Sequence, residues 1–225
     1  SVLLIFGPRA SEEFGSNLFS ANLFVTGLLR GIYPFWETDY GFGTPLPLGP
    51  TISHHPLALL LPFVSMRMFY SLYWVLQLGL GSYALLFFLR DLRVKPIISW
   101  ISVLVFALSP ATMDYSYVDD WITNYFSWTM YPVVFWTAYR LVSQNSSTAI
   151  VKPAILFGLL LGFVILNSHP SYLVHMSIVG LLFILVFTWR QVGGISIGRI
   201  LLAVVIALLV SSEWIYHVLF EWNYF

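Results

Sequence analysis

The sequence predicts an all-α protein, a multi-span transmembrane helical bundle with a large extracytoplasmic first loop that carries interfacial helices. Of the 225 residues, 59% are hydrophobic and only 9% are charged, whereas about 25% of the residues in a soluble domain are charged. The mean hydropathy is +0.83. Apolar runs close to the length that crosses a bilayer as a helix recur from residue 69 onward. These observations together predict a membrane protein.

Composition also excludes several classes of function. Ten basic residues balance ten acidic ones, so there is no basic surplus to neutralise a phosphate backbone, and no nucleic-acid partner is expected. The chain contains no cysteine, which rules out disulfides, thiolate metal sites and cysteine nucleophiles.

Residues 1–68 are expected to hold the end of a truncated first span, Ser1–Phe6, followed by the extracytoplasmic loop. Apolar and polar residues alternate at helical spacing over Asn17–Gly31, which predicts an amphipathic helix in the membrane interface. The Gly/Pro/aromatic stretch Tyr33–Pro45 cannot form a regular helix. The apolar run Leu57–Val64 is too short to span and predicts a second interfacial or re-entrant helix.

Residues 69–225 are expected to form one membrane domain of six spans, a fragment of a longer chain. Pro96 and Pro153 suit the first turn of a helix, and Pro132 lies inside its span, where it can kink the helix. Gly158 and Gly162 form a small-xxx-small pair suited to close helix packing. The expected spans are Phe69–Leu89, Pro96–Pro110, Phe126–Val142, Pro153–Ser168, Tyr172–Trp189 and Ile200–Phe220.

Basic residues set the expected orientation, because they concentrate in alternate loops, and such loops stay cytoplasmic. Loops 90–95, 140–152 and 190–199 are therefore expected in the cytoplasm, and loops 7–68, 111–125 and 167–171 outside it. Nine of the ten acidic residues then fall on the outer side. Acidic residues contribute little to orientation, so this segregation suggests a polar site on the outer face.

Several outer-face residues are candidates for that site. Asp119 and Asp120 can hold acceptor hydroxyl groups or a divalent cation, and capping of the helix from Trp121 explains them equally well. His169 precedes a proline, which favours an extended backbone. It can donate to a phosphate, orient a carboxylate or simply cap a helix. Arg67 can pair with a phosphate or extend to lipid headgroups.

Two adjacent histidines in the outer loop form a further candidate pair. His54 and His55 are neighbours in the chain, a spacing that suits a single metal ion poorly. We therefore expect them to serve the structure of the interfacial loop.

The order of segments and several local phrases resemble the bacterial YfhO-like membrane proteins and, more broadly, the GT-C superfamily of polyprenyl-phosphate-sugar glycosyltransferases. The phrases are Gly31-Ile32-Tyr33-Pro34-Phe35-Trp36 with Tyr40-Gly41-Phe42-Gly43, then His55-Pro56-Leu57, and Asn167-Ser168-His169-Pro170. The last is similar to a Gly-Gly-His-Pro-like corner, with Asn167-Ser168 in place of the glycines.

This resemblance implies an enzyme of the bacterial cytoplasmic membrane that moves a sugar from a polyprenyl-phosphate carrier to an acceptor on the outer face. It implies a catalytic carboxylate early in the first outer loop, where this chain has Glu12 and Glu13 and the family usually has Asp. Arg67 would contact the lipid phosphate, and Asp119, Asp120 and His169 would shape the acceptor site. The expected partners are membrane lipids and the lipid-linked sugar; whether a cofactor is needed stays open, with a divalent cation less favoured.

Simpler interpretations of the same residues remain open. Glu12 and Glu13 are also typical of a solvated turn or a helix start. The alternative function is a non-enzymatic accessory or scaffold subunit of a larger complex, in which the aromatic outer loop contacts other membrane protein subunits. A transporter is disfavoured because the chain has no evident repeat and few charges within its spans.

Overall fold

The computed structural model is helical, apart from turns and one two-residue β-ladder. The structure describes residues 12–31, 36–37, 44–45, 54–110, 112, 122–143, 151–168, 175, 178, 180, 182, 197–212 and 215. The all-α fold class is therefore confirmed for these residues. The helices are α2 (Glu12–Leu29), the 3-10 helix η2 (Pro56–Leu60), α3 (Met66–Asp91), α4 (Pro96–Ala107), α6 (Ile122–Ser143), α7 (Val151–Asn167) and α9 (Ile197–Val210).

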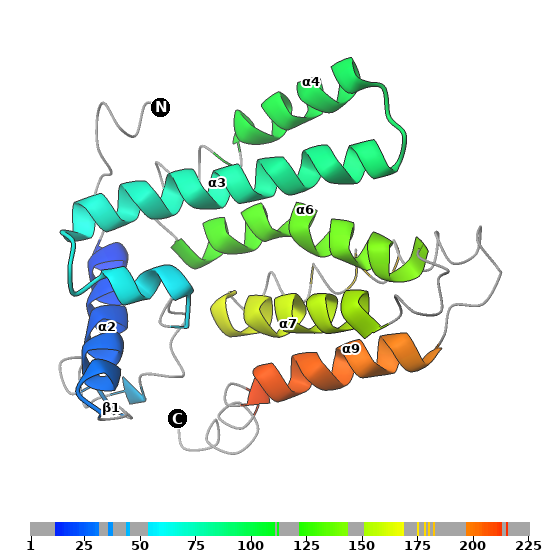
Figure 1. The fold of residues 1–225 in the computed structure, drawn as a ribbon. Helices are drawn as coiled ribbons and strands as arrows, with labels where there is room; N and C mark the ends of the chain where they lie inside the picture. The colour runs from blue at the N-terminus through cyan, green and yellow to red at the C-terminus, as the bar shows by residue number, and fades with distance from the viewer. Residues whose placement is uncertain are drawn as a thin grey trace.

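Five of these helices lie side by side in the order α4, α3, α6, α7, α9, and α2 crosses one end of the layer together with η2 (Figure 1). We call this the α2 end. It holds the beginnings of α3 and α6 and the end of α7. The opposite end, which we call the basic end, carries Arg90, Arg93, Lys95, Arg140, Lys152 and Arg199.

Four of the six predicted spans are present as α3, α4, α6 and α7 with small shifts at their ends, and the last, expected over Ile200–Phe220, is described as α9, Ile197–Val210. α3 begins before the expected Phe69 because the Ser65 hydroxyl caps it, accepting a hydrogen bond from the Met68 N–H at 3.3 Å. α4 begins at Pro96 as expected, because proline at the first turn sacrifices no hydrogen bond. Pro132 lies within α6, which continues on both sides of it.

Fewer helices than predicted have, within the described residues, the length and hydropathy of a membrane span. Among the helices that the structure describes, α3 is the one that is both long and apolar enough to cross a bilayer, and α4, α7 and α9 are apolar but shorter. Most of the expected span Tyr172–Trp189 lies outside the described residues. Its four described positions, 175, 178, 180 and 182, are helical.

The first loop contains the expected amphipathic helix, although α2 begins at Glu12 rather than Asn17. Its buried stripe is Leu18, Ala21, Phe24 and Val25, which belongs to the same apolar core as the bundle helices. This stripe therefore packs on protein, whereas the sequence predicted contact with the membrane interface. Within Tyr33–Pro45, Trp36–Glu37 pairs antiparallel with Thr44–Pro45. These residues are not helical, as the sequence predicted.

α3 and α6 run parallel and share an aromatic core. The Tyr125 hydroxyl donates to the Trp74 carbonyl oxygen at 2.9 Å, and both side chains are buried. Gly81 permits the close approach: a Cβ at this position would lie 2.5 Å from the Thr129 carbonyl oxygen. Because glycine has no side chain, the backbones of α3 and α6 are in direct contact here.

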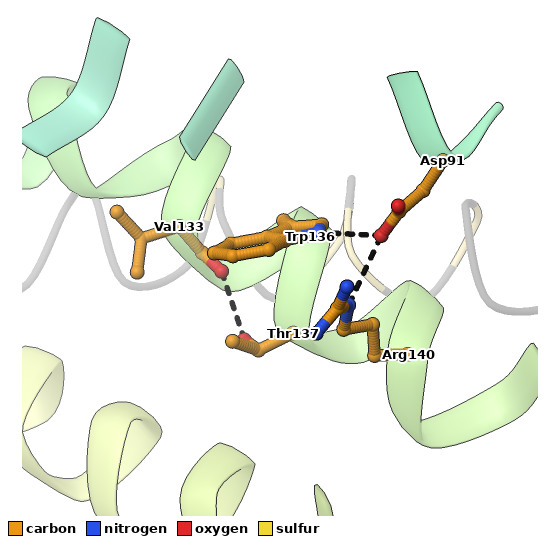
Figure 2. Close-up of polar contacts among 5 residues, drawn as sticks. All are labelled: Asp91, Val133, Trp136, Thr137 and Arg140. Carbon is orange, nitrogen blue, oxygen red and sulfur yellow. Dashed lines mark hydrogen bonds and ion pairs between the residues drawn. The ribbon is translucent and has the colours of Figure 1, made fainter. Parts of the chain in front are cut away.

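At the basic end, a three-residue contact joins the last turns of α3 and α6 (Figure 2). Oδ2 of Asp91 accepts from Trp136 Nε1 at 2.8 Å and from Arg140 Nε at 3.0 Å. The Arg140 guanidinium also lies over the Trp136 ring, 4.8 Å from its centre. Charge-assisted hydrogen bonds are among the stronger ones, so this contact opposes sliding of α3 along α6.

The small-xxx-small pair of α7 faces α9, which confirms its predicted packing role. A Cβ on Gly158 would lie 2.6 Å from the Ala203 carbonyl oxygen, and one on Gly162 would lie 2.6 Å from the Val210 Cβ. Ala203 and Ala207 are buried on the α9 side. Only small residues fit at this contact.

Replacing Gly162 by Val should lower the free energy of unfolding by about 1–3 kcal/mol, because overpacking forces the helices apart. Thermal unfolding in mild detergent measures the effect. Gly79→Ala is the matched control, since no atom lies within 4 Å of the added Cβ and alanine favours a helix. Equal unfolding midpoints for Gly162→Val and the unmodified chain would contradict the α7–α9 contact.

Candidate functional site at the α2 end

The α2 end contains a chain of hydrogen bonds that begins in η2 and crosses α3 to reach α6. Nδ1 of His55 caps η2 by accepting from the Leu57 N–H at 3.1 Å. Nε2 of the same ring lies 2.6 Å from the side-chain amide of Gln77. That amide is 3.5 Å from the Thr129 hydroxyl, which donates to the Tyr125 carbonyl oxygen at 2.9 Å.

The proton positions along this chain follow from its ends. Because Nδ1 of His55 accepts from a backbone N–H, the neutral ring carries its proton on Nε2. The structure places the amide nitrogen of Gln77 toward Nε2 and its oxygen toward the Thr129 hydroxyl. A half-turn of the amide exchanges these two atoms, so that the oxygen accepts from the Nε2–H and the nitrogen donates to the Thr129 hydroxyl. Each group both donates and accepts, so the bonds reinforce one another.

Aromatic rings enclose His55 and keep it neutral. Tyr73, Phe126 and Phe163 lie 5.0, 5.6 and 5.4 Å from its ring centre. Burial lowers the pKa of His55 to about 4, and it also lowers the pKa of His54, whose ring packs on Phe24. Both ring nitrogens of His55 are engaged, so this histidine positions η2 and is not available as a general base.

Other buried polar atoms at this end have no hydrogen-bond partner among the described residues. They are Asn22 Oδ1 on α2, Tyr73 Oη and Trp74 Nε1 on α3, and Asn167 Oδ1 and Ser168 Oγ at the end of α7. A buried polar group left without a partner costs about 1–3 kcal/mol. Water molecules or the hydroxyl groups of a ligand would satisfy them, so the α2 end has buried polar atoms available for a ligand.

The predicted site residues are only partly placed. Arg67 lies in the first turn of α3 at the α2 end; its side chain is exposed and forms no ion pair within the described part of the chain. Glu12 and Glu13 form the first turn of α2, with side chains outside what is described. Asp119, Asp120 and His169 lie outside the described residues.

The sequence interpretation missed the roles of His55 and Gln77. His55 was expected only to serve the interfacial loop. In the structure its ring is buried, and its Nε2 contacts the side-chain amide of Gln77 on α3. A glutamine within an otherwise apolar helix was the available signal, because an uncompensated amide there is costly and implies a partner.

The state of His55 predicts how stability depends on pH. The unfolded chain binds a proton near pH 6.5 and the folded chain only near pH 4, so the folded state is destabilised as the pH falls through that window. The loss attributable to His55 is at most about 3 kcal/mol. Thermal unfolding of the unmodified chain and of His55→Gln between pH 7.5 and 4 measures it, with a substitution of the exposed His175, His175→Gln, as the control. Identical pH dependence in the unmodified chain and His55→Gln would refute the assignment.

Comparisons with known proteins identify no family for this chain. No protein-family model matches it, and no curated protein or solved structure matches it significantly.

Proposed function

We propose that this chain is an integral membrane protein whose layered helices cross a bilayer. The observation that carries the proposal is the distribution of large apolar side chains over the outward faces of α3, α4, α7 and α9. Val105 is 64% exposed, Ile97 66% and Leu209 68%. Continuous exposure of this kind is unfavourable in water and normal in contact with lipid.

The charges of the two ends support one orientation. The basic end carries the arginine and lysine residues that close the turns between helices, and short basic loops are retained in the cytoplasm. The α2 end then faces outward, and α2 lies across the outer surface of the bundle (Figure 1). This is the arrangement that an outer-face site requires.

Within that frame we propose transfer of a sugar from a polyprenyl-phosphate carrier to an acceptor hydroxyl. Glu12 or Glu13 takes the hydroxyl proton while the acceptor oxygen bonds to the anomeric carbon. The bond from that carbon to the phosphate oxygen breaks, and polyprenyl phosphate leaves with the electron pair. Arg67 would offset the charge that develops on the leaving phosphate.

The placement of the candidate residues in the chain supports a common site. Arg67 is in the first turn of α3 at the α2 end, and Asp119 and Asp120 stand shortly before Ile122 in the chain, where α6 begins at the same end. His169 follows Ser168, at the close of α7. The resemblance of the sequence suggests the reaction, and the neighbouring ends of α3, α6 and α7 support a common site for these residues.

The orientation can be tested with single cysteines, because the chain has none of its own. Arg30→Cys and Lys95→Cys both replace exposed residues, one at each end. A membrane-impermeant maleimide added to intact cells should label Arg30→Cys, whereas Lys95→Cys should react only after permeabilisation. Labelling of both variants in intact cells would reject the membrane-spanning arrangement.

The catalytic assignment predicts that Glu12→Gln or Glu13→Gln lowers sugar transfer by about 10²–10⁴-fold, the typical contribution of a general base. Transfer from a radiolabelled polyprenyl-phosphate sugar measures this, with Glu37→Gln as the control in the same loop. Unchanged turnover in both variants would exclude the two glutamates as bases. Native mass spectrometry offers a second test. Stoichiometric binding of other membrane subunits, with no prenyl lipid bound, would reject the enzyme and favour the alternative function of an accessory subunit.

A further inference from the structure

The turn between α3 and α4 places an arginine where helices normally end with glycine. Arg93 has φ 59, in the left-handed region that L side chains rarely adopt. The Arg93 N–H donates to the Arg90 carbonyl oxygen at 2.9 Å, and the Val94 N–H donates to that of Leu89 at 3.0 Å. These bonds form a Schellman cap, whose left-handed position is usually glycine.

An arginine in this position needs a reason beyond the turn. A positive charge required only to orient the chain would serve as well at Leu92 or Val94, neighbours whose φ values are not positive. Strained backbone is retained where the side chain it presents has a use. Arg93 is exposed, with Arg90 and Lys95 beside it in the same turn.

The single acidic residue of this turn does not neutralise the group. Asp91 already accepts hydrogen bonds from Trp136 and Arg140 through Oδ2 (Figure 2). Arg140 donates only its Nε in that contact, and its side chain is 44% exposed. Asp91 thus offsets the charge of Arg140, while the terminal nitrogens of Arg140 still offer hydrogen-bond donors beside the turn.

Tryptophans place these cations at a defined depth. Trp100, which is exposed, lies just over one helical turn from the start of α4, and Trp136 lies one turn before Arg140. Tryptophan is enriched where hydrocarbon meets headgroups. In the membrane arrangement proposed above, the exposed Trp100 sets this depth, and the cations of the turn lie at the level of the lipid phosphates.

We propose that Arg90, Arg93, Lys95 and the terminal nitrogens of Arg140 form a binding site for the phosphate of an anionic lipid. This site lies at the basic end, away from the sugar-transfer site. The inference rests on the membrane-spanning part of the proposed function and is independent of the reaction. The guanidinium groups match two phosphate oxygens at once, which an ammonium cannot do.

The test is native mass spectrometry of the purified chain in mixed micelles with equal phosphatidylglycerol and phosphatidylcholine. Phosphatidylglycerol adducts should fall about five-fold in Arg93→Gly and further when Arg90→Gln and Lys95→Gln are added. Arg30→Gln removes one exposed cation from the α2 end and should leave the adducts unchanged. Equal losses in Arg93→Gly and Arg30→Gln, or no loss in either, would overturn the site.

Folding and binding are separable in this test. Arg93→Gly relieves the left-handed strain, so its unfolding temperature should not fall while its lipid adducts do. Retention of the lipid in added inorganic phosphate, at constant ionic strength, supports a lipid ligand. Displacement by low phosphate concentrations would overturn the lipid assignment in favour of a soluble phosphate.

The result is also distinguishable from failure of the proposed function. If the cysteine labelling supports the membrane orientation and no lipid preference is found, only the lipid site fails. If both exposed cysteines react in intact cells, the membrane-spanning arrangement fails, and the lipid site fails with it. Loss of sugar transfer in the glutamate variants bears on neither result.

Discussion

The close parallel packing of α3 against α6 is the contact on which the rest of the described structure depends. It holds at mid-helix because Gly81 lets the Thr129 carbonyl approach. Near the α2 end the same pairing positions Gln77 between His55 and Thr129, and at the basic end it brings Asp91 to Trp136 and Arg140. Parallel neighbours require a return segment, and α4 supplies it by packing along α3.

Much of this fold follows from local chemistry in the sequence. Apolar runs locate α3, α6 and α7, proline marks the beginning of α4, and Gly158 with Gly162 marks a close helix contact. These features depend on residues near one another in the chain, so periodicity and propensity identify them. The identity of the partner helix is different: no local pattern specifies that Gly158 faces Ala203.

The candidate site was less predictable because its contacts join distant segments. His55 and Gln77 belong to different elements, and neither residue alone indicates a shared hydrogen bond. Arg93 violates the local rule that puts glycine at a left-handed cap, so the sequence gives no sign of that cap. Of the predicted site residues, the described side chains include Arg67, and its place at the α2 end agrees with the sequence; the roles of Glu12, Glu13, Asp119, Asp120 and His169 remain predictions.

The contacts of His55 impose an order of assembly on the chain. Its ring packs against Phe126 of α6 and Phe163 of α7, which are synthesised after α3 and α4. The segment around η2 therefore leaves the ribosome long before its binding surface exists, with two histidines and several apolar side chains uncovered. His55 can cap η2 and reach Gln77 earlier, but the apolar enclosure that lowers its pKa is complete only once Phe163 of α7 is in place.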